Sequence, residues 1–353
     1  MSEIHGTVDP GFERVRDAFA RNFENGELGA AVCAYADGRK VVDLWGGWAD
    51  AARTRPWRRD TLTCTFSAMK AMTATCAHHL IDAGRLDLDA PVARYWPEFA
   101  QAGKQDVTVR MVLSHQSGLP WATAGRPSEK FFDWETQTDA LARSAPVYEP
   151  GTRCMYHGGS FGYLVGEIVR RIDGRTLDAY FREEIAAPLH ADVLVALGPE
   201  QDDRSAEMTG PENMVGPSNT RAWRAAGDGA ATGSATAEGF ARVYAALARG
   251  GELGGVRVLR PETIAAVARQ QALAHAEGTA NDGQGEFGLG YQLFWKMYPG
   301  MGTKTFGHTG MGGSMALADP ERRLGFGYVM NTLRTDGATT TALLRATYRA
   351  LAS

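Results

Sequence analysis

Ser67-Ala68-Met69-Lys70 places a hydroxyl and an amine three residues apart at the expected start of a helix. Side chains at positions i and i+3 share one helical face, so the amine can lie beside the serine oxygen without help from other elements. A serine hydroxyl is a weak nucleophile until a neighbouring base takes its proton, and a lysine amine can be that base. The stretch therefore predicts a nucleophile, Ser67, activated by Lys70.

The residues that follow support this interpretation. An apolar stripe with helical spacing runs through Met69, Met72, Cys76 and Leu80, and Gly84 is a natural stop for the helix. The chain has six lysines, and Lys70 alone stands three residues after a serine. A lysine at the buried start of such a helix is unusual unless it has a chemical task.

The bulk composition excludes several classes of protein. The 353 residues are 44% hydrophobic and 22% charged, as in an ordinary soluble globular protein, and the net charge of −4 gives no electrostatic footprint for nucleic acid. No run approaches the roughly 18 apolar residues of a membrane span, and the first residues lack the pattern of a signal peptide. We therefore expect a cytoplasmic protein with neither a nucleic-acid nor a membrane partner.

Cysteine and histidine spacing gives no metal motif. The four cysteines contain no CxxC pair and are expected to be reduced and mostly buried, and the eight histidines form no HExxH or His-x-His cluster. We therefore expect neither a metal site nor a cofactor.

The hydrophobic pattern predicts strands at both ends of the chain around a helical middle. Strands are expected at residues 30–35, 40–45, 288–294, 303–309, 314–318 and 325–331. Helices are expected at residues 11–25, 109–114, 134–144, 161–172, 177–185, 237–249 and 339–351. This pattern predicts an α+β fold, an α/β sandwich whose antiparallel sheet is built from both chain ends. Residues 1–85 and 251–353 would form that domain, and 86–250 a mainly helical one, with the active site at their interface.

A serine–lysine pair needs partners, and two segments supply candidates. Tyr156 stands just before an expected helix and could handle protons. The glycine-rich run 306–313 ends a strand, where glycine lets a substrate approach the backbone closely and backbone N–H groups could hold an oxyanion.

Taken together, these segments resemble the serine β-lactamase fold, in particular class C β-lactamases and family VIII carboxylesterases. Residues 67–70 match the S-x-x-K motif, and 84–92 resemble the segment after that helix. Residues 113–120 resemble the LLxHTSGLP stretch, 150–156 the segment with the catalytic tyrosine, and 308–310 occupy the K-T-G position. The resemblance covers nearly the whole chain in the right order.

The resemblance implies roles for the matching residues. Ser67 would form an acyl-enzyme, and Lys70 and Tyr156 would share the general-base work. The N–H groups of Ser67 and Met311 would form the oxyanion hole, and a water activated mainly by Tyr156 would release the acid.

Substrate contacts are expected at Gly158, His308, Thr309 and Gly310, and two of these depart from the class C pattern. Gly158 replaces the asparagine whose amide binds the side chain of the antibiotic, and His308 replaces the lysine that attracts its carboxylate. Imidazole is mostly neutral at pH 7, so both changes remove anchors for an anionic β-lactam. We therefore expect a carboxylesterase for short-chain or small uncharged esters.

Three alternatives remain open. The chain could be a weak class C-like β-lactamase, D-amino-acid peptidase or amide hydrolase, or a non-catalytic, penicillin-binding-like sensor domain. Residues 158–162 also match G-x-S-x-G, which would make Ser160 the nucleophile, but the preceding segment is too polar and Pro-Gly-broken for the required strand. We expect Ser160 to cap the following helix and His115 to be structural. The oligomeric state is left open.

Overall fold

The computed structural model describes residues 3–125, 130, 132–269, 286–298 and 300–352. A seven-stranded antiparallel sheet has the strand order β1-β3-β2-β12-β11-β10-β9. Its members are β1 Ile4–Val8, β2 Gly29–Ala36, β3 Arg39–Gly47, β9 Gln292–Leu293, β10 Phe306–Thr309, β11 Met315–Asp319 and β12 Leu324–Met330. The first and last parts of the chain thus share one sheet, and the α+β prediction is confirmed.

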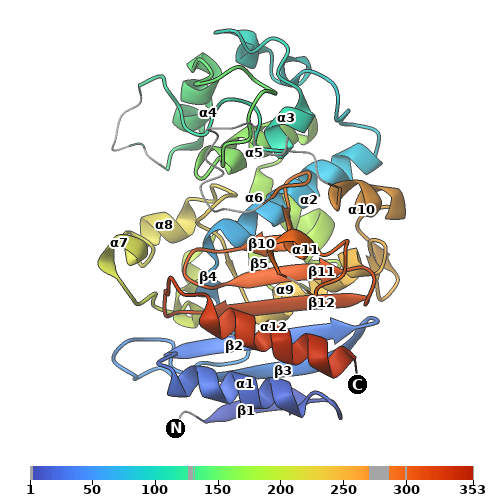
Figure 1. Cartoon of the computed structure of the whole chain (residues 1–353). Helices are drawn as coiled ribbons and strands as arrows, with labels where there is room; N and C mark the ends of the chain where they lie inside the picture. The colour runs from blue at the N-terminus through green and yellow to red at the C-terminus, as the bar shows by residue number, and fades with distance from the viewer. Residues whose placement is uncertain (1–2, 126–129, 131, 270–285, 299, 353) are drawn as a thin grey trace.

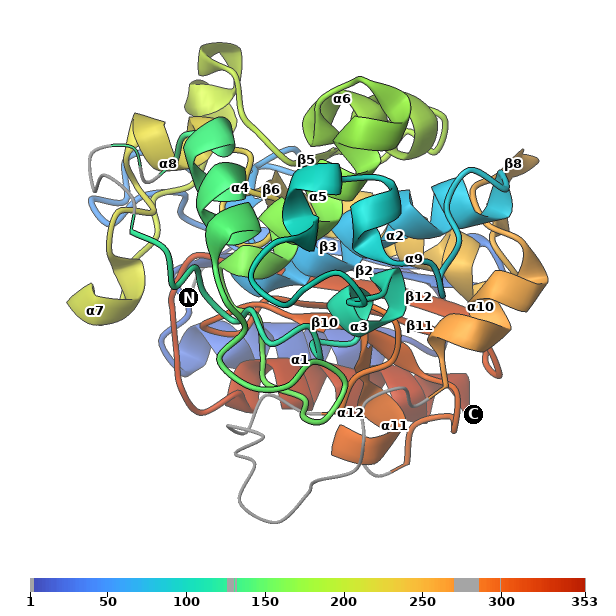
Figure 2. The same cartoon turned by 90° about the horizontal axis from the view of Figure 1, so that it is seen from above.

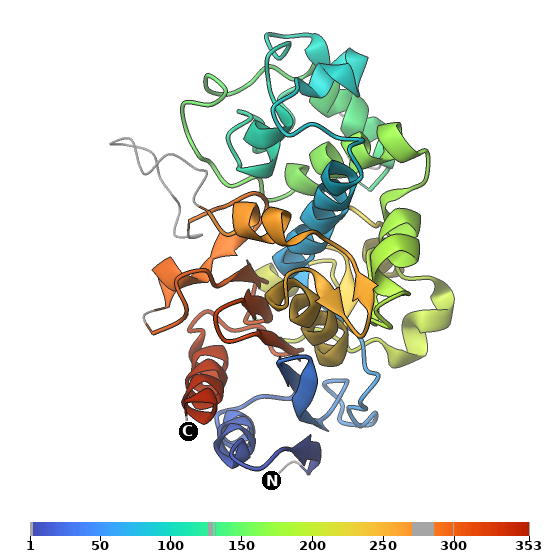
Figure 3. The ribbon, with the colours of Figure 1, turned by 90° about the vertical axis from the view of Figure 1, so that its right-hand side faces the viewer.

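Helices cover both faces of this sheet (Figures 1 and 3). Helices α1 (Glu13–Glu24) and α12 (Ala338–Leu351) lie side by side on one face, and α9 (Ala237–Ala248) lies on the other. Successive residues of β12 point to opposite faces of the sheet, which explains this arrangement. Phe326 and Tyr328 pack in the core under α1 and α12, while Gly325 and Gly327 face α9. A Cβ atom at Gly325 would lie 2.2 Å from a backbone nitrogen of α9, so glycine is what lets the helix pack this closely.

The middle of the chain is largely helical and stands above the sheet (Figures 1 and 2). Helix α2 (Met69–Asp82) runs between the two parts and packs against α5. The other helices are α3 Val109–Leu113, α4 Trp134–Arg143, α5 Ser160–Asp173, α6 Leu177–Phe181, α7 Glu212–Val215, α8 Arg221–Ala225, α10 Pro261–Val267 and α11 Phe294–Met297. Two small sheets complete the fold, with strands β4 Thr63–Cys64, β5 Val193–Leu194, β6 Ser234–Ala235, β7 Glu252–Leu253 and β8 Val256–Arg257.

Several expected elements differ in detail. β1 was not expected, because its five residues include only two large apolar side chains, Ile4 and Val8, and a glycine in the middle. The strand expected over 288–294 is limited to β9, since α11 begins at Phe294, and the strand expected over 303–309 begins at Phe306. Residues 197–228, for which neither a helix nor a strand was expected, contain the short helices α7 and α8. Helix α9 was expected within the helical domain, but it packs on the sheet. The expected domain boundaries stay a prediction.

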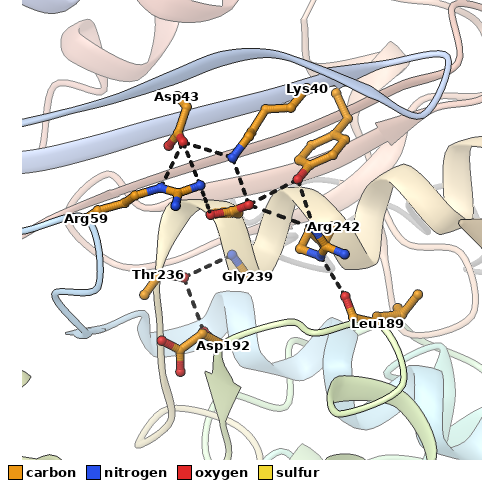
Figure 4. Close-up of polar contacts among 10 residues, drawn as sticks. Lys40, Asp43, Arg59, Leu189, Asp192, Thr236, Gly239 and Arg242 are labelled. Atoms are coloured by element: carbon orange, nitrogen blue, oxygen red, sulfur yellow. Dashed lines mark hydrogen bonds and ion pairs between the residues drawn. The ribbon is translucent and has the colours of Figure 1, made fainter. Parts of the chain in front are cut away.

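A network of charged side chains ties α9 to the sheet (Figure 4). Lys40 Nζ lies 2.9 Å from an oxygen of Asp43 and 3.0 Å from one of Glu238 on α9. Arg59 bridges the same two carboxylates, at 2.9 and 2.8 Å. Because each carboxylate meets more than one cation, the network fixes the orientation of α9 better than an isolated surface pair would. A cavity of about 550 Å³ beside it, lined by Trp45 among others, includes none of the expected site residues.

Candidate active site

The predicted serine–lysine pair is present. Ser67 lies in a 3-10 turn, Phe66–Ala68, that leads directly into α2, and Lys70 occupies the first turn of that helix. Lys70 Nζ donates hydrogen bonds to Ser67 Oγ at 3.1 Å and to the carbonyl oxygen of Ala230 at 3.0 Å. The lysine side chain is fully buried, whereas Ser67 is partly exposed. A buried amine fixed against a reachable hydroxyl is the geometry that a nucleophile and its base require.

The backbone just before the serine is strained. Phe66 has a φ of 46°, in the left-handed region that bulky residues avoid. The side chain is held in the core and packs against the ring of Trp223. Strain of this kind persists when the surroundings fix it, and it is common at functional sites. Here it accompanies the turn that presents Ser67.

Tyr156 joins this pair from the segment before α5. Its ring lies 4.9 Å from Lys70 Nζ, measured to the ring centroid, and stacks on Phe287 at 5.7 Å. His115 packs against it at 5.1 Å and His308 at 6.3 Å, again between centroids. The structure therefore brings Ser67, Lys70, Tyr156 and His308 together from three separate segments.

Three buried histidines near Tyr156 are neutral. Burial lowers the pKa of His308 to about 3 and that of His157 to about 4, with a further contribution from the charge of Lys70. Burial, His157 and Lys70 hold the pKa of His115 well below its ordinary value. The backbone N–H of His157 donates a hydrogen bond to His115 Nδ1 at 3.1 Å, which fits a structural role for His115. The surroundings of Tyr156 are therefore polar but carry no imidazolium charge at neutral pH.

The turn between β10 and β11 packs directly on the segment that leads to Ser67. A Cβ atom at Gly310 would lie 2.1 Å from the carbonyl oxygen of Thr65, so only glycine fits there. The Gly310 N–H bonds to the Ser314 carbonyl, within the hairpin. Among the residues that the structure describes, the N–H of the next residue, Met311, has no hydrogen-bond partner. A free N–H at this place is what the expected oxyanion hole needs.

Of the other expected substrate contacts, Thr309 lies at the end of β10 and Gly158 lies beside Tyr156. The Thr309 N–H and hydroxyl both donate to Gln292 Oε1, at 2.8 and 3.0 Å, which fixes the end of β10. Gly158 lies beside Tyr156, where a Cβ atom would be 3.8 Å from the phenol ring. A small side chain at position 158 would therefore fit without displacing the tyrosine.

Ser160 has a role different from the one expected. It is the first residue of α5, but the helix is capped by Gly159 without a side-chain bond. The Ser160 hydroxyl instead donates to the carbonyl oxygen of Leu119 at 2.5 Å and is buried. The expected helix cap is therefore wrong, because a tertiary acceptor lies within reach.

Two residues that hold the side chains of this site could not be found from sequence motifs. Ala230 acts through its backbone carbonyl, which any residue would supply. Phe287 holds Tyr156 by stacking, and its sequence context carries no signal for this contact. No cluster of three or more metal-ligating side chains occurs within the described ranges. Nor does that part of the chain contain a helix with the length and apolar character of a membrane span.

The sheet, the helical part and the Ser67–Lys70 pair at the start of α2 together define the class of serine β-lactamases and penicillin-binding proteins. The chain belongs to the beta-lactamase family, whose model matches residues 14–349. It is 36% identical to the esterase/beta-lactamase LipL of Mycobacterium tuberculosis, over 94% of this chain and 83% of that protein.

Solved structures agree with this assignment. A family VIII carboxylesterase is 40% identical, with a TM-score of 0.92 over 99% of this chain and 100% of that one. A penicillin-binding protein homolog from Caulobacter crescentus is 37% identical, with a TM-score of 0.88 over 99% of this chain and 100% of that one. The predicted family is confirmed.

Proposed function

We propose that this protein is a serine carboxylesterase that hydrolyses small, uncharged esters through an acyl-enzyme on Ser67. The observation that carries the proposal is the buried Lys70 amine, 3.1 Å from a partly exposed serine oxygen. The esterase names of the relatives support the same reaction class.

The proposed reaction uses these residues in turn. Lys70, in its amine form, takes the Ser67 proton as Oγ attacks the carbonyl carbon of the ester. The N–H groups of Ser67 and Met311 hold the oxyanion, and the departing alkoxide receives the proton and leaves as the alcohol. Water then attacks the acyl-enzyme with the help of Lys70 and Tyr156, which releases the acid and restores Ser67.

The residues around Ser67 favour an uncharged substrate. His308 stays neutral because burial lowers its pKa to about 3, so this position offers no cation to a carboxylate. Gly158 provides no side chain for an acylamide group. Uncharged esters therefore suit the site better than β-lactams. Weak β-lactam hydrolysis is the second candidate, and the combined name of LipL favours it.

Cytoplasmic location stays a prediction.

The test compares hydrolysis of p-nitrophenyl butyrate by wild type, Ser67→Ala and Ser160→Ala. Ser160 is the matched control, since its hydroxyl is bonded to Leu119 and lies outside the proposed machinery. We expect Ser67→Ala to lose at least 10³-fold in kcat/KM and Ser160→Ala to stay within about fivefold. Circular dichroism checks folding, and mass spectrometry should detect the butyryl adduct in wild type. Activity that survives Ser67→Ala contradicts the proposal, and stoichiometric acylation without turnover supports a sensor.

A further inference from the structure

The segment that carries Tyr156 is held by the side chain of the next residue, His157. The phenol is not anchored through its own oxygen, because Tyr156 Oη bonds to none of the described residues. His157 is fully buried, and each of its two ring nitrogens lies within hydrogen-bond distance of a partner. A buried imidazole that is bonded on both sides has one fixed orientation, and it fixes the backbone to which it is bonded.

The two partners of the His157 ring assign its hydrogen. Nδ1 lies 2.6 Å from the carbonyl oxygen of Met155, and a carbonyl oxygen only accepts, so Nδ1 carries the hydrogen. The ring is neutral, since burial lowers the pKa of His157 to about 4. Nε2 is therefore an acceptor, and the buried Ser117 hydroxyl, 2.7 Å away, donates to it. A chain of hydrogen bonds thus runs from Ser117 through His157 to the residue before Tyr156.

Backbone groups on both sides of Tyr156 complete this arrangement. The Met155 N–H donates to the His115 carbonyl oxygen at 3.0 Å, and the His157 N–H donates to His115 Nδ1 at 3.1 Å. His115 has a φ of 60°, in the left-handed region that residues other than glycine seldom occupy. Its ring packs on the phenol at 5.1 Å between centroids. Both chain neighbours of Tyr156 are therefore bonded to one short segment, residues 115–117.

Resting on the proposed function, we propose that His157 is a positioning residue for deacylation. Its bonds to Ser117 and to the backbone fix the peptide around Tyr156 and keep the phenol beside Lys70, whose amine lies 4.9 Å from the centre of that ring. In deacylation the oxygen of water bonds to the acyl carbon, and the bond from that carbon to Ser67 Oγ breaks. The proton that the water loses goes to the Lys70 amine and then to Oγ, and Tyr156 assists from its fixed place and keeps its own hydrogen.

A displaced Tyr156 should affect one step of the reaction. In the proposed reaction Lys70 takes the Ser67 proton during acylation, and Tyr156 helps only in the attack of water. For an acyl-enzyme mechanism kcat/KM reports the steps up to acylation, whereas kcat also includes deacylation. Loss of the His157 bonds should therefore lower kcat, leave kcat/KM nearly unchanged and let the acyl-enzyme accumulate. A merely structural role would lower both constants equally, because less enzyme would be folded, and no acyl-enzyme would accumulate.

Hydrolysis of p-nitrophenyl butyrate by His157→Leu, His157→Asn and Ser117→Ala tests this role. We expect kcat to fall about 10-fold in His157→Leu, which loses both ring bonds, while kcat/KM stays within about threefold of wild type. His157→Asn keeps a donor near the position of Nδ1, so it and Ser117→Ala should each lose only about threefold in kcat. Mass spectrometry during turnover should show more butyryl-enzyme in His157→Leu than in wild type. His79→Asn is the matched control and should keep both constants, since that histidine bonds to Tyr180 at 2.7 Å from the last turn of α2.

A second comparison adds Tyr156→Phe to each variant. Because His157 acts through the tyrosine hydroxyl, the double variant with His157→Leu should match Tyr156→Phe alone within about twofold in kcat. Losses that multiply in the double variant would overturn the inference, and so would equal falls in kcat and kcat/KM without butyryl-enzyme. If His157→Leu lacks the wild-type circular dichroism spectrum, Ser117→Ala takes its place in both comparisons. Failure of the proposed function is seen separately, as activity that survives Ser67→Ala.

Discussion

Replacing Gly310 with alanine tests whether the β10–β11 turn holds half of an oxyanion hole. The added Cβ would lie 2.1 Å from the Thr65 carbonyl oxygen, and ordinary contact begins at about 3.4 Å. The Thr65 oxygen is a backbone atom and the added Cβ is attached directly to the backbone of residue 310. One of these two backbone segments must therefore move by about 1.3 Å. Thr65 leads into the turn that carries Ser67, and Gly310 precedes Met311, so the shift separates the two N–H groups that would hold the oxyanion.

The expected effect falls mainly on the reaction rate. A misplacement of about 1 Å costs about 10²-fold, and loss of one oxyanion donor costs about 10²–10³-fold. We therefore expect Gly310→Ala to lower kcat/KM for p-nitrophenyl butyrate by about 10²-fold. Overpacking should also cost about 1–3 kcal/mol of folding stability. Thermal melting of each variant, followed by assays well below its midpoint, separates the two effects.

Gly159→Ala is the matched control for this experiment. Gly159 lies at the start of α5 with a negative φ, and its added Cβ would have no neighbour within 4 Å. This variant should keep wild-type activity and stability. If Gly310→Ala retains kcat/KM within threefold of wild type, the turn does not set the geometry of the oxyanion and the roles given to Gly310 and Met311 are wrong.

Two further predictions concern stability. Burial raises the pKa of Glu27 from 4.5 to about 7, so the folded protein holds a proton there that the unfolded chain has lost, and stability at this group falls as the pH rises through that window. Glu27→Gln keeps an acceptor for the Tyr328 hydroxyl. It should remove about 3 kcal/mol from the difference in unfolding free energy between pH 4.5 and pH 8, measured by urea unfolding at both values. If the unfolding free energy of the variant changes with pH as much as that of wild type, the prediction is wrong. Lys104 is fully buried and donates to the carbonyls of Gln101, Ala142 and Ser144. Lys104→Met should therefore cost about 3 kcal/mol in urea unfolding while kcat/KM stays near wild type, and an unchanged midpoint would count against this.

The local sequence pattern was enough to predict those elements whose structure depends on residues close together in the chain. The alternation of β2 and β3, the periodicity of α2 and the spacing of Ser67 and Lys70 are short-range features, and each appears in the structure close to its expected place. Elements that depend on distant partners were predicted less well. β1 exists because it pairs with β3, and Ser160 bonds to Leu119 because the fold brings that carbonyl to it.

The sequence by itself determined the fold class and the contact between the Ser67 hydroxyl and the Lys70 amine, because a serine and a lysine three residues apart in a helix meet whatever surrounds them. Only the tertiary structure decided the proton states around Tyr156. His308 comes from β10, His115 and Tyr156 from the helical part, and Lys70 from α2, and their burial together makes the histidines neutral. Desolvation and the field of a neighbouring charge depend on atoms far apart in the chain, so no local pattern contains them.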